Sequence, residues 1–226
     1  MASDEIARKV ILMTAWLSKW GPLAGVLSSL LFIVSFVLGS GSPDSSASGQ
    51  QVIQWYTQHG HQVVSDSVVG LAMFFFVIFA AMLPRHIRRG EGWLANAAVA
   101  GAVCIGIGAT ILQGIDLVLA RDAKHLTDAS AQTLILLENN FQLPWALGVA
   151  LFGVLAGLAV VAGRILPAWM GWVLFALGAV SLVPPLSWFA FLLMMLWTLI
   201  AGIWMVRQGP PAVTTDPVTP QERVLA

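Results

Sequence analysis

Residues 71–89 read LAMFFFVIFAAMLPRHIRR, a bulky apolar run that stops at Pro84 and leads at once into basic side chains. An apolar helix that ends in arginines is the pattern of a transmembrane helix at its cytoplasmic end, because Lys and Arg gather on the cytoplasmic side of membranes. This stretch therefore predicts a membrane-spanning helix that leaves the bilayer on the cytoplasmic side.

Further apolar runs lie on both sides of this one. Each is close to the roughly 20 apolar residues that a transmembrane helix needs. We therefore predict an all-α, polytopic membrane protein, built as a bundle of six transmembrane helices with short helices on the outer surface. The six predicted spans are 22–39, 67–83, 94–119, 144–163, 166–183 and 186–206.

The eleven Lys and Arg residues are distributed unevenly over the segments between these runs. If the N-terminus lies inside, the outer segments hold only Arg121 and Lys124. The cytoplasmic segments then hold the other nine, which are Arg8, Lys9, Lys19, Arg85, Arg88, Arg89, Arg164, Arg207 and Arg223. This asymmetry predicts that both termini are cytoplasmic and that the segments 40–65 and 120–143 are outside.

The composition limits the classes of function that remain. The chain of 226 residues is 58% hydrophobic and 10% charged, whereas soluble domains carry about 25% charge. A net charge of zero gives no electrostatic footprint for nucleic acid, and no phosphate-binding loop is present for a nucleotide. Cys104 is the only cysteine, so the chain can form neither an internal disulfide nor a zinc–thiolate cluster.

The chain divides into one membrane domain and two flanking segments. Residues 1–20 carry apolar side chains at helical spacing and predict a cytoplasmic, interfacial amphipathic segment; a single long first helix is the alternative. Residues 21–206 form the six-helix transmembrane domain. The first run is longer than a secretory h-region of about 7–15 residues, so we expect it to be retained rather than cleaved. Residues 207–226 are rich in Pro and Thr and predict a disordered cytoplasmic tail.

The third run differs from the others because small residues recur along it. The stripe consists of Ala98, Ala102, Gly106, Thr110 and Gly114. Small side chains let helix backbones approach closely in a membrane. We therefore expect this run to be the central packing helix of the bundle.

Several polar residues border the apolar runs on the predicted outer side. Asp116 is about 23 residues from Trp93, or about 34 Å at helical rise, which places it at the outer interface. The ligand-binding residues that we predict are Gln113, Asp116, Asp66, Glu138, Asn139 and Asn140. Convergent polar groups beside an apolar bundle are typical of a small-molecule site, here between the second, third and fourth spans. The alternative is that these groups only wet the outer surface, with Asp116 solvated or paired with Arg121.

No catalytic residue, metal ligand set or cofactor is predicted. The four histidines, His59, His61, His86 and His125, all lie outside the predicted spans, which disfavours paired haem ligands across a bundle. Their spacing matches no specific metal-binding motif. We find no nucleophile elbow and no HExxH sequence.

Three segments carry a resemblance to a protein family. They are SPDSSASGQQVIQWYTQHGHQVV at 42–64, AMLPRHIRRGEG at 81–92 and LPAWMGWVLFALG at 166–178. With them the chain resembles the uncharacterised multi-spanning integral membrane proteins of actinobacteria. The resemblance implies six helices, a short helix in the first outer loop and a bacterial cell membrane. It implies no activity.

The sequence leaves three classes of function. The first is a non-enzymatic component that acts in membrane assembly, regulation or partner binding. The second is a transporter or binder of a small lipophilic molecule, with an outward-facing pocket. The third is a membrane enzyme acting on a lipid or quinone, which would need His59, His61, Asp66, Asp116 or Glu138 to cluster. The expected partners are the lipid bilayer and, beyond it, other membrane proteins or a second copy of the chain.

Overall fold

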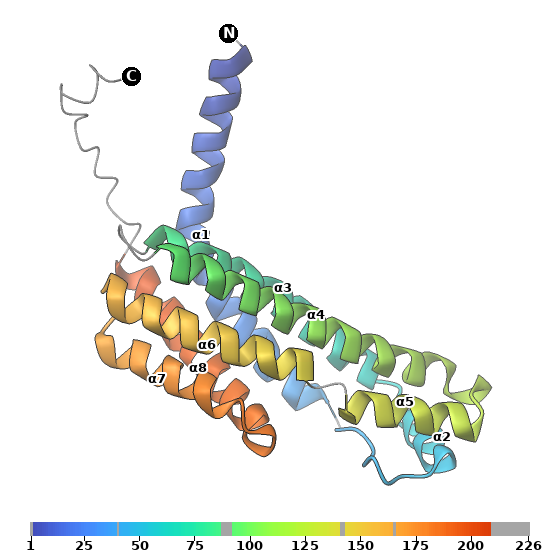
Figure 1. Cartoon of the computed structure of the whole chain (residues 1–226). Coiled ribbons are helices and arrows are strands. Elements are labelled where there is room, and N and C mark those ends of the chain that lie inside the picture. Colours follow the sequence, from blue (N-terminus) through green and yellow to red (C-terminus); the bar gives the residue numbers. More distant parts are fainter. Residues whose placement is uncertain (1, 40, 87–91, 141–142, 165, 209–226) are drawn as a thin grey trace, which may run out of the picture.

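A computed structural model describes residues 2–39, 41–86, 92–140, 143–164 and 166–208 of the chain. Every regular element within these ranges is helical (Figure 1). The elements are α1 (Ala2–Leu38), α2 (Gly49–Gln58), α3 (Gln62–His86), α4 (Gly92–Asp122), the 3₁₀ turn η1 (Ala123–His125), α5 (Asp128–Asn140), α6 (Leu143–Gly163), α7 (Ala168–Val180) and α8 (Pro184–Gln208).

The structure confirms an all-helical chain with several helices of membrane-spanning length. Among the described residues, five stretches are long and apolar enough to cross a bilayer, namely Trp20–Leu38, Gln62–Pro84, Trp93–His125, Asp128–Gly163 and Leu186–Gln208. The sixth predicted span, 166–183, contains only the 13-residue helix α7. At 1.5 Å per residue α7 is about 20 Å long, which is shorter than the roughly 30 Å hydrocarbon core. Its ends explain the difference, because Pro167 precedes it and the turn at residues 181–183 follows it.

The long helices alternate in direction and pack as antiparallel neighbours (Figure 1). α1 lies between α3 and α8, α4 lies between α3 and α6, and α7 covers the side of α6. The C-terminal end of α8 lies at the same end of the bundle as the point where α1 enters it (Figure 1). The predicted tail from residue 209 onward falls outside the described residues.

The first helix is continuous, so the boundary predicted at residue 20 is not a break in structure. α1 runs through Pro22, and its N-terminal part extends beyond the bundle (Figure 1). The segment is therefore one long helix, which was the alternative reading of the sequence. A Cβ on Gly202 would lie 2.8 Å from the Pro22 carbonyl oxygen, so this glycine lets α8 approach α1 at the proline.

The end of the bundle away from the N-terminus carries a cap, which consists of α2, η1, α5 and the last turns of α4. Its apolar centre comprises Val52, Tyr56, Ile115, Leu119, Ala123, Ala131 and Ile135. Ser48 and Gln51 form a capping box that fixes the start of α2. The short helix predicted around residues 52–56 is therefore confirmed.

Ser65 and Asp66 lie one turn inside α3, which begins at Gln62. Their side chains bond to groups on α1 and within α3. Ser65 donates a hydrogen bond of 2.9 Å to the carbonyl oxygen of Ser35, and Asp66 accepts one of 3.2 Å from Gln62.

The small-residue stripe predicted on α4 is wrong beyond its first two members. Ala98 and Ala102 are fully buried, but Gly106 is only half-buried, and Thr110 and Gly114 are exposed. The close contact with α6 instead uses the glycines Gly101, Gly108 and Gly148, where added Cβ atoms would meet backbone atoms of the opposite helix. A spacing of four residues drifts around a helix of 3.6 residues per turn, so the stripe rotates out of the interface.

Candidate functional site

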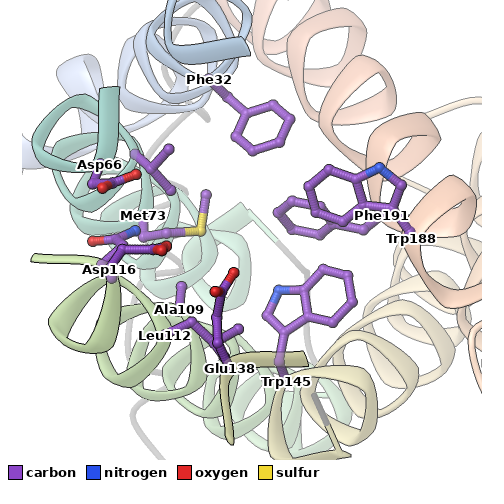
Figure 2. Close-up of a pocket in the computed structure, with 12 residues that line it drawn as sticks. Phe32, Asp66, Met73, Ala109, Leu112, Asp116, Glu138, Trp145, Trp188 and Phe191 are labelled. Carbon is purple, nitrogen blue, oxygen red and sulfur yellow. The ribbon is translucent and has the colours of Figure 1, made fainter. Parts of the chain in front are cut away.

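A cavity of about 320 Å³ lies beneath the cap, between the helices of the bundle (Figure 2). α1, α3, α4, α5, α6 and α8 all contribute side chains to it. The lining residues are Phe32, Asp66, Val69, Met73, Ala109, Leu112, Gln113, Asp116, Glu138, Trp145, Trp188 and Phe191. This volume is at the lower end of the range for small-molecule pockets, roughly 300–1,000 Å³.

One wall of the cavity is polar and comes from α3, α4 and α5. Asp66 is 8% exposed, and while its Oδ1 accepts the hydrogen bond from Gln62, its Oδ2 has no partner among the described residues. Glu138 hydrogen-bonds with Ser42, but its Oε2 is also buried and unpartnered. The Nε2 of Gln113 is the third such atom. Leaving one buried polar atom unpaired costs about 1–3 kcal/mol, so three of them at one cavity indicate a place for a polar ligand.

Asp116 is the carboxylate that joins the cavity to the cap. Its Oδ1 accepts a hydrogen bond from the hydroxyl of Tyr56, which is 1% exposed. The alternative that Asp116 pairs with Arg121 is replaced by this contact with α2. Burial raises the pKa of the Tyr56 phenol well above its usual range, and the negative charges of Asp116 and Glu138 raise it further. Tyr56 is therefore a neutral hydrogen-bond donor.

The ionisable side chains that line the cavity are all acidic. Asp116 interacts electrostatically with both Asp66 and Glu138, so the three acidic groups share one local field. Among the described residues that line the cavity, none is Lys, Arg or His. Such a cleft with low-dielectric walls concentrates the field and attracts positive charge.

The opposite wall is aromatic and comes from α1, α6 and α8 (Figure 2). Four rings touch one another in sequence. Phe32 meets Phe191 edge-on at a centroid distance of 5.2 Å, Phe191 meets Trp145 at 4.9 Å, and Trp145 lies 5.8 Å from Trp188. We call Phe32, Trp145, Trp188 and Phe191 the aromatic wall.

The structure brings four of the six predicted site residues together and separates the other two. Asp66, Gln113, Asp116 and Glu138 all line the cavity. Asn139 and Asn140 do not, and instead line a separate depression beside the turn between α7 and α8. Their side-chain amides donate to the carbonyl oxygens of Ile135 and Leu136, at 2.9 and 2.7 Å. Each residue turns a helix by about 100°, so neighbours of Glu138 face other directions.

Sequence analysis missed the aromatic wall and the involvement of α1 and α8. We expected the pocket between the second, third and fourth spans, whereas Phe32, Trp188 and Phe191 belong to the first and last long helices. Trp145 and Trp188 were not among the predicted site residues. The signal that could have found them was their depth, because the predicted topology puts both at the level of Asp116.

His59, His61 and His125 are not among the residues that line the cavity. His59 stacks on Trp55 at 4.3 Å, and its Nδ1 lies 2.8 Å from the Trp55 carbonyl oxygen. A membrane enzyme would need His59 or His61 to cluster with the acidic residues. Neither histidine lines the cavity, so this cluster is not formed there. Within the described part of the chain, no group of three or more His, Cys, Asp or Glu residues is arranged to hold a metal ion.

No protein-family model, curated protein or solved structure matches this chain. The function must therefore be argued from the site itself.

Proposed function

We propose that the chain is a multi-pass protein of the plasma membrane that binds a small amphiphilic molecule in the cavity beneath the cap. Both termini are cytoplasmic, and the cap faces the outside of the cell. The cavity supplies hydrogen-bond acceptors on one wall and apolar surface on the other, which is the composition of a small-molecule site. This function belongs to the second of the three classes that the sequence left open, a binder of a small lipophilic molecule.

The orientation rests on charge and on the course of the helices. In the proposed orientation, the cytoplasmic segments of the sequence hold nine of the eleven basic residues, and the cap segments hold the other two. A cytoplasmic C-terminus requires α7 to complete a sixth crossing despite its length. The alternating directions of α6, α7 and α8 support that crossing (Figure 1), and a short helix can be accommodated by local thinning of the bilayer.

The environment of Asp66 is the main support for the binding function. Asp66 is more than nine-tenths buried, one of its carboxyl oxygens has no partner within the described ranges, and the residue borders a cavity whose far wall is aromatic. A carboxyl group in that position has no structural role that uses its free oxygen. A bound ligand would give that oxygen a partner.

A partner-binding role is the second candidate. The observation that favours it is the N-terminal part of α1, which extends beyond its neighbours (Figure 1). Ile6, Val10, Met13 and Leu17 recur there at helical spacing and suit a membrane surface or another helix. Chemical crosslinking in cells, with and without residues 2–18, tests this role independently of the cavity.

The binding function is tested by ligand-dependent thermal stability in lipid nanodiscs. A molecule that binds only the folded state raises Tm in proportion to the logarithm of its concentration. A panel of small amphiphiles with positive, neutral and negative head groups is screened against the wild type. Ala109→Trp fills the cavity, and Ile111→Trp on the same helix is the control, because Ile111 is 40% exposed and lies outside the cavity lining.

We expect at least one amphiphile to raise the Tm of the wild type and of Ile111→Trp but not that of Ala109→Trp. Equal responses of the two variants would place binding elsewhere. A panel that stabilises neither the wild type nor the control would contradict the binding function.

A further inference from the structure

We infer that the ligand of this cavity is an organic cation, an ammonium group carried by an apolar body, held between the acidic wall and the aromatic wall. This inference rests on the proposed binding function and narrows it to one class of ligand. It is carried by the placement of Asp66, Glu138 and the four aromatic rings around one space (Figure 2).

The acidic wall selects positive charge. Asp66 and Glu138 line the cavity, and each has a buried carboxyl oxygen with no partner in the described part of the chain; Asp116 adds a third carboxyl group. An anion would be repelled by each of these carboxyl groups that is ionised, and a neutral apolar molecule would leave the two oxygens unpaired. An ammonium group removes both costs, because it pairs with the free oxygens directly.

The aromatic wall selects an organic cation over a metal ion. Ca²⁺ takes six to eight oxygen ligands at about 2.3–2.6 Å, and Mg²⁺ demands a near-octahedral set. The described residues contain no grouping of three acidic side chains arranged for a metal. Ring faces such as those of Trp145 and Trp188 instead attract alkylammonium groups, which keep their charge spread over a weakly hydrated surface.

The remaining surface of the cavity accounts for the apolar body of the ligand. Val69, Met73, Ala109 and Leu112 lie below the acidic groups on α3 and α4. Met73 is a flexible side chain whose sulfur makes favourable contacts with aromatic rings. The cavity volume of about 320 Å³ exceeds what a bare ammonium group would fill.

Tyr56 acts as a positioning residue in this arrangement. Its hydroxyl occupies Oδ1 of Asp116, which fixes that carboxyl group at the edge of the cavity. Gln62 fixes Asp66 in the same way through Oδ1 and leaves Oδ2 for the ligand. Two of the three acidic groups are thus oriented before a ligand arrives, which reduces the entropy cost of binding.

The test compares three probes of similar size in nanodiscs by calorimetric titration. The probes are benzyldimethylammonium, which keeps one N–H donor, its uncharged isostere isobutylbenzene, and benzenesulfonate. For the wild type we expect the cation to bind about tenfold or more tightly than the isostere, and the anion not to bind. Asp66→Asn and Glu138→Gln should each remove most of that preference. Asp128→Asn, which removes an exposed acidic group outside the cavity lining, should leave it unchanged.

The aromatic wall has its own variant, which keeps the result informative if Asp66→Asn does not fold. Trp145→Leu should weaken binding of the cation more than binding of the isostere, since the substitution removes a ring face but keeps apolar surface. Equal affinity of cation and isostere in the wild type would overturn the inference while leaving the binding function intact. Loss of preference in Asp128→Asn as large as in Glu138→Gln would also overturn it. If none of the three probes binds, the inference fails, and the wider amphiphile panel decides whether the binding function fails with it.

Discussion

The hydroxyl of Tyr56 on α2 donates a hydrogen bond to Oδ1 of Asp116 on α4, across 60 residues of sequence. This contact ties the cap to the bundle at the edge of the cavity. The tyrosine is almost fully buried in the apolar centre of the cap, so its hydroxyl depends on that single acceptor. The cap and the site are therefore coupled, and perturbing one should be detectable in the other.

Removing the hydroxyl should destabilise the cap. Tyr56→Phe leaves Asp116 without its donor, and we expect a loss of about 1–3 kcal/mol in the free energy of unfolding. Thermal unfolding in nanodiscs measures it. Thr57→Val is the matched control on the same helix, because the Thr57 hydroxyl is exposed and bonds only within α2. A Tyr56→Phe protein as stable as the control would show that the contact contributes nothing.

The pH dependence of Tyr56 follows from its raised pKa. An ordinary tyrosine ionises near pH 10, whereas burial and neighbouring negative charge keep Tyr56 neutral above that pH. The stability that the neutral Tyr56 phenol contributes is fully present below the pKa of tyrosine in the unfolded state. It is lost as pH rises above about 10, because the unfolded state releases the proton first. Tyr56 is the only tyrosine, so tyrosinate absorbance reports it alone. We expect no tyrosinate signal at pH 10–11 until the protein unfolds. A reversible titration near pH 10 in the folded protein would contradict this.

The packing of α4 on α6 predicts opposite effects for two glycines on one helix. A Cβ at Gly101 would collide with backbone atoms of Phe152, whereas a Cβ at Gly106 would meet only a side-chain methyl of Val77 at 3.4 Å. Gly101→Ala should therefore lower Tm markedly, while Gly106→Ala should be neutral or slightly stabilising through its better helix propensity, up to about 1 kcal/mol. Equal changes in Tm would mean that the two glycines do not differ in packing.

The proposed topology is tested by labelling single cysteines in intact cells, after Cys104→Ser removes the native thiol. We expect an impermeant reagent to label cysteine at Ser46 or Ser130 in the cap segments. Cysteine at Leu182, between α7 and α8, should be labelled too if α7 crosses the membrane. Cysteine at Gly90 should not be labelled. Labelling at Gly90 alone would reverse the orientation, and failure at Leu182 alone would remove the sixth crossing.

The lengths of the apolar runs predicted the fold well, because a bilayer requires each helix that crosses it to be apolar over about 20 residues. Five of the six runs became long apolar helices, and the boundaries at Pro84 and at Arg207 agree with the structure within two residues. α7 was overestimated because an apolar turn has the same hydropathy as an apolar helix. The face of α4 that packs against α6 was also predicted wrongly. Composition shows where small residues lie, but it does not show which of them another helix covers.

The sequence predicted the depth of the site residues in the membrane, but it did not predict the direction in which their side chains point. Threading the chain put Asp66, Gln113, Asp116 and Glu138 at one level, and the structure brings them to one cavity. It put Asn139 and Asn140 at the same level, but the rotation of α5 turns them elsewhere. Trp145 and Trp188 come to the cavity only through tertiary packing, which buries Trp145 and leaves Trp188 44% exposed.

The central claim is that an outward-facing cavity admits cations in preference to anions, and one measurement tests it most directly. Leu112 is half-buried and lines the cavity. In a Cys104→Ser background, cysteine at position 112 is treated in intact cells with a cationic and with an anionic impermeant methanethiosulfonate of matched size, and the two modification rates are compared. Cysteine at Ile111, which faces away from the cavity on the same helix, is the control. We predict modification at position 112, with the cationic reagent at least tenfold faster relative to the control ratio. No modification, or equal rates for the two reagents, would contradict the claim.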